Sequence, residues 1–88
     1  MLHKVSLPEG PFRIAVAPDE SSIAVTCNRE NVVALMDFDI GEKTVVKKLN
    51  TKKTPVGICY TIDGKRLLVA CEEDNVLMNI AVPVSGKK

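Results

Sequence analysis

The sequence predicts an all-β protein, and three observations lead to this expectation. Apolar residues form 45% of the 88 residues but aromatic residues only 3%, so the core must come mainly from Val, Ile, Leu and Ala. Val and Ile are β-branched and favour pleated sheets. The apolar runs are short and are bounded by Pro, Asp, Gly and Asn, which are turn residues. The pattern of runs and turns also occurs twice along the chain.

The repeat has an offset of 44 residues without gaps, which divides the chain into residues 1–44 and 45–88. Identical pairs at this offset include Pro11 and Pro55, Ile14 and Ile58, Asp19 and Asp63, Val25 and Val69, Cys27 and Cys71, Asn31 and Asn75, and Val32 and Val76. A period of roughly 40 to 45 residues is typical of β-propeller blades and of helical repeats. The local pattern favours strands, because the apolar runs are too short for helices.

Four strands are predicted in a complete repeat, which is the content of one antiparallel propeller blade. The hairpin signals are Pro18-Asp19 in the first repeat and Asp63-Gly64 in the second. Strands are expected over Arg13–Ala17, Ser22–Thr26, Val32–Asp37 and Thr44–Leu49, and again over Ile58–Thr61, Arg66–Ala70 and Val76–Ala81.

The fourth strand of the second repeat is expected at the other end of the chain. A shift of 44 residues places Leu2–Leu7 on Val46–Thr51, which overlaps the fourth strand of the first repeat. The chain ends at 85–88, inside the turn that should precede the missing strand. The prediction is therefore two four-stranded antiparallel sheets, with the N-terminal strand displaced to close a blade.

These residues resemble the YVTN family of β-propeller repeats. Pro11–Asp19 and Pro55–Ile58 match the first half of the family pattern, and Asn31–Asp37 matches its third strand. Cys27 and Cys71 stand where the family has the Asn of its name-giving tetrapeptide. The resemblance covers nearly the whole chain and implies two consecutive propeller blades.

Two blades alone would leave broad apolar faces uncovered, because each blade is normally buried on both sides. We therefore expect a binding or assembly scaffold that joins further blades or copies of itself into a closed ring. Head-to-tail contacts close a ring when the rotation fits. A homotrimer with six blades is preferred and a tetramer with eight is the alternative. A different class, part of a lactonase-like or oxidoreductase-like propeller enzyme, would need catalytic residues from other blades.

Ligand or partner loops are expected at the mouth of the propeller channel, over residues 8–12, 28–31, 51–56 and 72–75. The second repeat carries a short acidic run, Glu72-Glu73-Asp74, which could attract a cation or a basic peptide. The alternative is that these loops only keep strand edges soluble. The candidate residues are Asn28, Arg29, Glu30, Asn31, Glu72, Glu73, Asp74 and Asn75, with Lys52 and Lys53 in the linker.

No catalytic residue, cofactor or metal site is predicted. The only histidine, His3, is expected as an exposed side chain on an outer strand. Cys27, Cys59 and Cys71 form an odd set without a CxxC pair, which favours reduced thiols in a cytoplasmic protein. Equivalent positions in sheets stacked about 10 Å apart are too distant for a disulfide, so small buried thiols are expected. A net charge of +1 without a basic block argues against a nucleic-acid partner. No apolar run approaches the roughly 20 residues that span a membrane.

Overall fold

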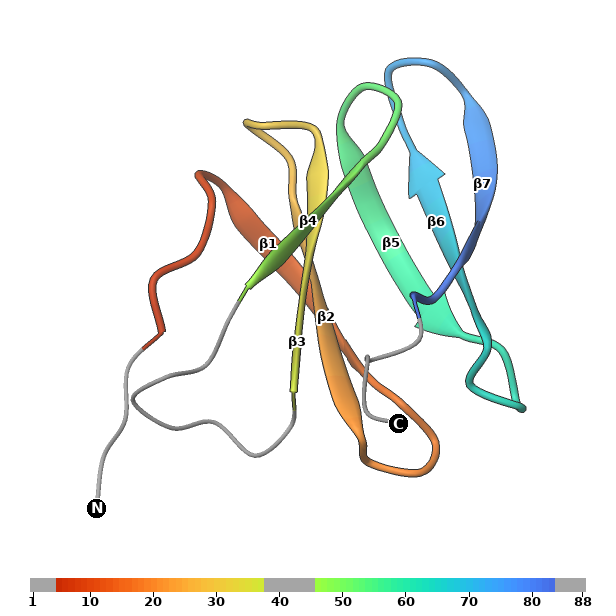
Figure 1. Ribbon diagram of the computed structural model, residues 1–88. Helices are drawn as coiled ribbons and strands as arrows, with labels where there is room; N and C mark the ends of the chain where they lie inside the picture. The colour runs from red at the N-terminus through yellow and green to blue at the C-terminus, as the bar shows by residue number, and fades with distance from the viewer. Residues whose placement is uncertain (1–4, 38–45, 84–88) are drawn as a thin grey trace.

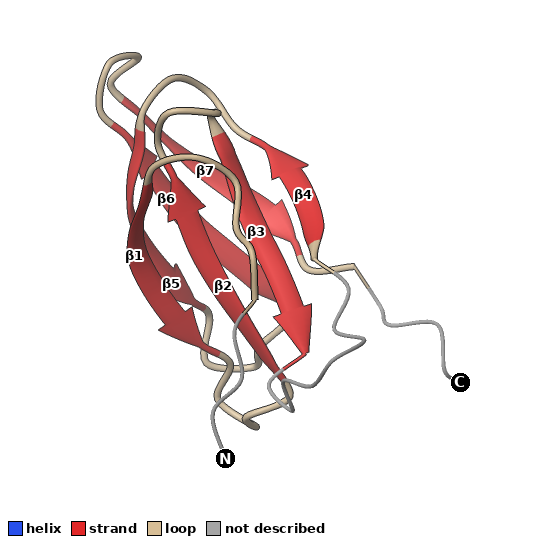
Figure 2. Ribbon diagram, turned by 90° about the vertical axis from the view of Figure 1, so that its left-hand side faces the viewer, coloured by secondary structure: helices blue, strands red, loops and turns tan. Residues whose placement is uncertain are grey.

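The computed structural model describes residues 5–37 and 46–83, which form seven strands in two antiparallel sheets (Figure 1). The strands are β1 (Pro11–Val16), β2 (Ser22–Cys27), β3 (Val32–Asp37), β4 (Lys47–Asn50), β5 (Pro55–Tyr60), β6 (Arg66–Cys71) and β7 (Val76–Ala81). We call β1–β4 sheet A and β5–β7 sheet B. Figure 2 shows the two sheets as stacked layers. Among the described residues no helix is long and apolar enough to span a membrane.

The 44-residue repeat is visible in the backbone. Both sheets begin with a bulged strand, since the register shifts between Pro11 and Arg13 and again between Pro55 and Gly57. The first hairpin of each sheet has a residue with positive φ, which is Glu20 in sheet A (62°) and Gly64 in sheet B (74°). The left-handed conformation suits Gly and strains other residues. Glu20 therefore adopts a backbone conformation that the second repeat assigns to glycine.

The core between the sheets consists of small and medium apolar side chains. Its buried members are Ala24, Val33 and Leu35 from sheet A and Leu67, Val69 and Cys71 from sheet B. One hydrogen bond also joins the sheets, between the Ser22 and Tyr60 hydroxyl groups at 2.7 Å. Burial raises the pKa of Tyr60, and the hydrogen bond to Ser22 opposes this effect. The repeats thus fold as one unit, with one face of each sheet against the other.

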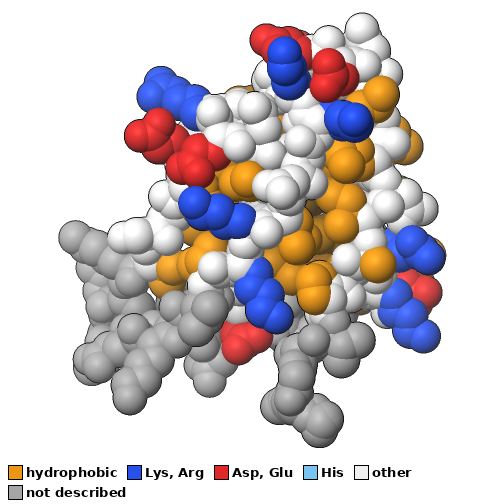
Figure 3. All heavy atoms as spheres, turned by 45° about the horizontal axis from the view of Figure 1, so that its top comes forward, with side chains coloured by type: hydrophobic (Ala, Val, Ile, Leu, Met, Phe, Trp, Pro, Cys, Tyr) orange, Lys and Arg blue, Asp and Glu red, His pale blue; other side chains and the backbone are white. Residues whose placement is uncertain are grey.

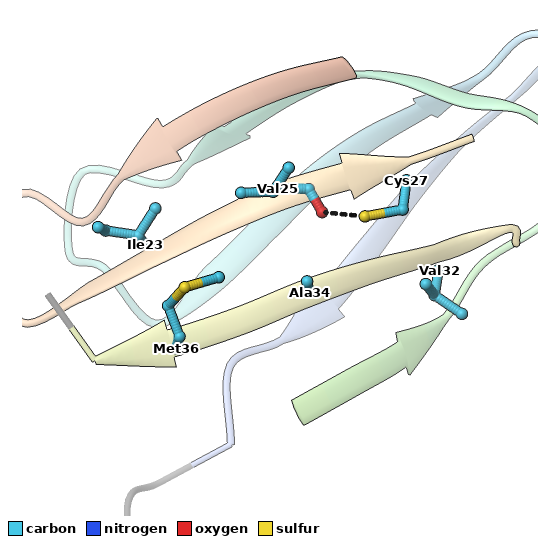
Figure 4. Packing of buried hydrophobic residues seen from close by; sticks show 6 residues of the cluster. All are labelled: Ile23, Val25, Cys27, Val32, Ala34 and Met36. Carbon is cyan, nitrogen blue, oxygen red and sulfur yellow. Dashed lines mark hydrogen bonds between the residues drawn. The ribbon is translucent and has the colours of Figure 1, made fainter. Parts of the chain in front are cut away.

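The opposite face of sheet A is also buried over β2 and β3 (Figure 4). The cluster contains Ile23, Val25, Cys27, Val32, Ala34 and Met36. Val5, Leu7 and Val46 pack against it from outside the strands. The segment before β1 therefore covers a face that would otherwise be exposed.

The all-β class and the two antiparallel sheets confirm the sequence prediction. β3 and β7 have the predicted bounds, whereas β1 and β5 begin earlier, at Pro11 and Pro55. Proline is tolerated as the first residue of a strand, where its missing N–H costs little. The fourth strand of sheet A runs over Lys47–Asn50, later than the predicted Thr44–Leu49, whose first two residues lie outside the described ranges.

Sheet B has three strands among the described residues, so the two predicted four-stranded sheets are found only in part. The missing strand was expected from residues 2–7 of the chain. Leu2, His3 and Lys4 lie outside the described residues, and so does the expected exposure of His3. Val5 and Leu7 are described but belong to no strand.

The prediction of three buried thiols is wrong for Cys59. Cys27 and Cys71 are buried, and burial raises the pKa of both thiols. Cys59 is exposed, because it lies opposite Leu68 on the face of sheet B that is turned away from sheet A. Neighbouring strand residues point to opposite faces, so Ile58 and Tyr60 enter the core and Cys59 cannot.

Candidate functional site

The candidate loops lie together at one end of the two sheets. These loops are residues 8–10 before β1, 28–31 between β2 and β3, 51–54 between β4 and β5, and 72–75 between β6 and β7. They occupy the upper end of the molecule in Figure 1. All ten sequence-predicted site residues belong to this end, as antiparallel strands of similar length require.

In the first repeat, the segment before β1 is fastened to the loop between β2 and β3. The Asn28 N–H donates to the Gly10 carbonyl oxygen at 2.9 Å. The Glu9 N–H donates to the Glu30 carboxylate at 2.8 Å. Gly10 has φ +81° and lies so close to this loop that an added Cβ would stand 2.7 Å from the Asn28 Oδ1 atom. Only glycine fits there without a shift of the loop.

The second repeat makes the same two contacts 44 residues later. The Glu72 N–H donates to the Thr54 carbonyl oxygen at 2.9 Å. The Lys53 N–H donates to the Asp74 carboxylate at 3.0 Å. Asp74 therefore has a structural role at the equivalent position to Glu30. The linker between the sheets and the segment before β1 are held in equivalent ways.

Asn31 connects sheet A to the linker that leads into sheet B. Its backbone carbonyl accepts from the Thr51 N–H at 3.0 Å, and its Oδ1 atom accepts from the Thr54 N–H at 2.9 Å. Asn31 is left-handed, with φ +57°, a conformation that Asn tolerates better than most residues. One residue thus fixes both the end of β4, through its backbone carbonyl, and the entry to β5, through its side chain.

Asn75 is the equivalent residue of the second repeat and has φ +53°. Its N–H donates to the Glu72 carbonyl oxygen at 3.2 Å. In contrast to Asn31, it is exposed, and its side chain makes no hydrogen bond within the described part of the chain. Position 75 has the backbone conformation of position 31, but no described segment is bound to its side chain as residues 51–54 are bound to Asn31.

The charges of this end are mixed and exposed. Lys48 Nζ lies 3.2 Å from Glu30 Oε1. The Glu9 N–H and the Lys48 ammonium group hold the pKa of Glu30 below its usual value. Figure 3 shows acidic and basic side chains around this end, with hydrophobic side chains between them. Arg29, Lys52, Lys53, Glu72 and Glu73 are all exposed.

The acidic run does not form a ligand shell. Over residues 5–37 and 46–83 no group of three or more His, Cys, Asp or Glu side chains is placed to hold a metal ion. Asp74 is bound to the linker backbone, while Glu72 and Glu73 are exposed on the turn. The loops at this end of the sheets bind the segment before β1 and the linker before β5, and they expose charged side chains to solvent.

No protein-family model, curated protein or solved structure matches this chain. The function must therefore be inferred from the repeat, the exposed faces and the loop contacts.

Sequence reasoning missed two features that the repeat could have revealed. Gly10 and Thr54 lie inside expected loops, but their backbone contacts were not expected, and only the shared offset of 44 residues connects the two positions in the sequence. Exposed apolar side chains on both sheets were also not named as candidates. Ile14 and Leu77 are the clearest of these.

Proposed function

We propose that the chain is a two-blade unit of a β-propeller and serves as a binding and assembly scaffold. Copies join head to tail into a closed ring, preferably a homotrimer with six blades. A tetramer with eight blades is the alternative closure. One observation supports this most directly. Positions that are buried where the two sheets meet have equivalents, 44 residues away, that are exposed on the outer faces of the sheets.

The exposed outer face of sheet B is clearest at Leu77. Val33 holds the same place in sheet A and is 0% exposed, because sheet B covers it, whereas Leu77 is 69% exposed. Leu68 and Cys59 lie on the same outer face of sheet B. A row of apolar side chains on one face of a sheet is typical of a surface that binds another protein element.

The exposed part of the outer face of sheet A lies on β1. Ile58 and Tyr60 pack into the core between the sheets. Their equivalents Ile14 and Val16 are 64% and 47% exposed. Sheet B uses one of its faces to contact sheet A. The equivalent face of sheet A, 44 residues earlier in the sequence, is its outer face.

The exposed β1 part of the outer face of sheet A and the exposed outer face of sheet B belong to different sheets. If the contact within the chain is repeated between chains, the outer face of sheet A packs on the outer face of sheet B of a second copy. Such a contact is heterologous and produces a ring when the rotation closes. The resemblance to YVTN repeats supports blade geometry. In a ring, the loops with Glu72, Glu73 and Asp74 gather at one mouth, where they favour a basic peptide.

The deciding experiment is the solution mass of the purified chain, measured by light scattering over a wide range of concentrations. One chain has a mass of 9.6 kDa. We expect a species of three chains that dissociates on dilution. A mass of one chain at all concentrations would overturn the proposal.

A matched pair of variants separates assembly from folding. Leu77→Asp places a charge on the outer face of sheet B, at a position that is 69% exposed in the single chain. We expect this variant to remain folded but to stay a single chain. Glu73→Ala alters an exposed loop residue outside the apolar face and should assemble as the unchanged protein does.

A further inference from the structure

We infer that β7 and Asn75 of one copy bind residues 5–10 of a second copy, through the contacts by which β3 and Asn31 hold residues 49–54 within the chain. This inference rests on the proposed assembly and specifies its junction. It gives sheet B a fourth strand and gives Asn75 the partner that Asn31 already has.

The first support is the position of residues 5–10, called here the donor segment, within the single chain. Within the chain, Leu49 of β4 packs against the core cluster that contains Leu67. Val5 is the equivalent of Leu49, and it packs against the cluster that contains Ile23, the equivalent of Leu67. The donor segment therefore already lies against sheet A as β4 lies against sheet B.

The second support is the anchoring of this segment at its far end. The Glu9 N–H is bound to Glu30 and the Gly10 carbonyl to the Asn28 N–H. The equivalent bonds hold the linker beside the loop of sheet B, as described above. Gly10 also shares the left-handed conformation of Thr54, with φ values of 81° and 60°. The Gly10 N–H is thus presented as the Thr54 N–H is presented to Asn31.

The third support is that, among the described residues, β7 has an open edge and residues 5–7 belong to no strand. β7 is the edge strand of sheet B among the described residues, since the order is β5-β6-β7. An exposed edge presents N–H and carbonyl groups that can pair with another chain. Residues 5–7 belong to no strand, and Val5 and Leu7 pack against the outer face of sheet A.

The register of the junction follows from the pairing of β3 with β4. Val33 pairs with Leu49 and Val32 with Asn50. After the shift of 44 residues, Leu77 pairs with Val5 of the second copy, and Val76 with its Ser6. The Asn75 carbonyl then accepts from the Leu7 N–H, and the Asn75 Oδ1 atom from the Gly10 N–H. This pairing covers Leu77 and satisfies the Asn75 side chain.

A disulfide trap tests this register. The variant Ser6→Cys/Val76→Cys, in a Cys59→Ser background, places two thiols directly opposite each other across the junction. Directly opposed Cα atoms in an antiparallel pair are about 4.5 to 5.5 Å apart, within the range of a disulfide. The donor segment and β7 lie on opposite sides of one molecule (Figure 1), so a bond must join two chains. Oxidised glutathione supplies the oxidant.

We expect non-reducing gels to show linked chains in a ladder that ends at three, where the ring closes. The matched control is Ser6→Cys/Leu77→Cys, because Leu77 is displaced by one residue and its side chain points to the other face. This control should link at least about tenfold more slowly. Light scattering on the unchanged protein accompanies both variants.

A second measurement examines Asn75 without a disulfide. Asn75→Gly removes the side chain but retains a residue that accepts positive φ. We expect the concentration of half-assembly to rise about tenfold, by the loss of one hydrogen bond at each junction. Glu20→Gly is the matched control, because it also replaces a left-handed residue but lies at the other end of the sheets.

The outcomes distinguish the two proposals. If the unchanged protein assembles but Ser6→Cys/Val76→Cys links no faster than its control, this junction is wrong and the scaffold proposal stands. Assembly of Asn75→Gly at unchanged concentration would also overturn the junction. A single-chain mass for the unchanged protein at all concentrations would overturn both.

Discussion

Sheet A and sheet B have nearly the same pattern of residues but differ in what covers them. Sheet A is covered on one face by sheet B and on much of the other by Val5, Leu7 and Val46. Among the described residues, sheet B is covered on the face that meets sheet A, and Leu77 on its outer face is exposed. The difference teaches that burial in this fold depends on the neighbour of a strand, because the sequence pattern is common to both repeats.

The largest expected effect comes from the core that the sheets share. Leu67→Ala removes a fully buried side chain and should lower the free energy of unfolding by about 2 to 5 kcal/mol. Leu77→Ala, on the exposed face, should change it by less than about 0.5 kcal/mol under conditions where chains are separate. Urea unfolding followed by circular dichroism measures both. Equal losses would contradict the contrast between the faces.

Thiol reactivity gives a second comparison of faces. Cys59 should react with a thiol reagent at least about tenfold faster than Cys27 and Cys71, which are buried and whose pKa values burial raises. Mass spectrometry of partly modified protein identifies the sites. If copies assemble as proposed, the reaction of Cys59 should slow at high protein concentration. Unchanged reactivity in an assembled sample would place the contact on another face.

The two first hairpins offer a smaller test. Glu20→Gly gives the hairpin of sheet A the glycine that sheet B has at Gly64, and both positions have positive φ. The free energy of unfolding should rise by about 1 kcal/mol, because the strain of a left-handed Glu is removed. Thermal unfolding measures the gain. A loss of stability would mean that the Glu20 side chain contributes more than its backbone costs.

The smallest effect concerns acid. Glu30 has a lowered pKa in the folded chain, so its contribution to stability is present above the unfolded value near 4.5 and is lost as the pH falls through the folded value. Glu30→Gln should therefore reduce the loss of stability between pH 5 and about pH 3. Glu73→Gln is the control, because Glu73 is exposed and makes no hydrogen bond within the described ranges. An identical pH dependence in both variants would contradict this assignment.

The repeat made most of the fold predictable. The first residues of β3 and β7 were predicted correctly, because Asn31 and Asn75 mark the preceding turns at the same offset. The start of β1 was missed, since a bulge after Pro11 extends the strand beyond its apolar run. Cys59 was assigned to the wrong environment because alternation indicates two faces without telling which one meets the neighbouring sheet.

The candidate site was predictable as a location but not as a set of contacts. Turn residues placed the loops at one end, where the structure has them. The bonds to Gly10 and Thr54 involve backbone groups, which every residue type carries, so composition gives no signal for them. Only the φ values and the shared offset distinguish these positions from other loop residues.

The hydrogen bond between the Ser22 and Tyr60 hydroxyl groups distinguishes the two repeats from each other. Arg66 and Val16 take the places of these residues in the other repeat, so the two halves are not interchangeable. Sheet B of the same chain already occupies the face of sheet A that carries Ser22, so a second copy meets sheet A through its other face, where Val16 is 47% exposed. This pair of hydroxyl groups therefore helps to hold the order of the two repeats within one chain.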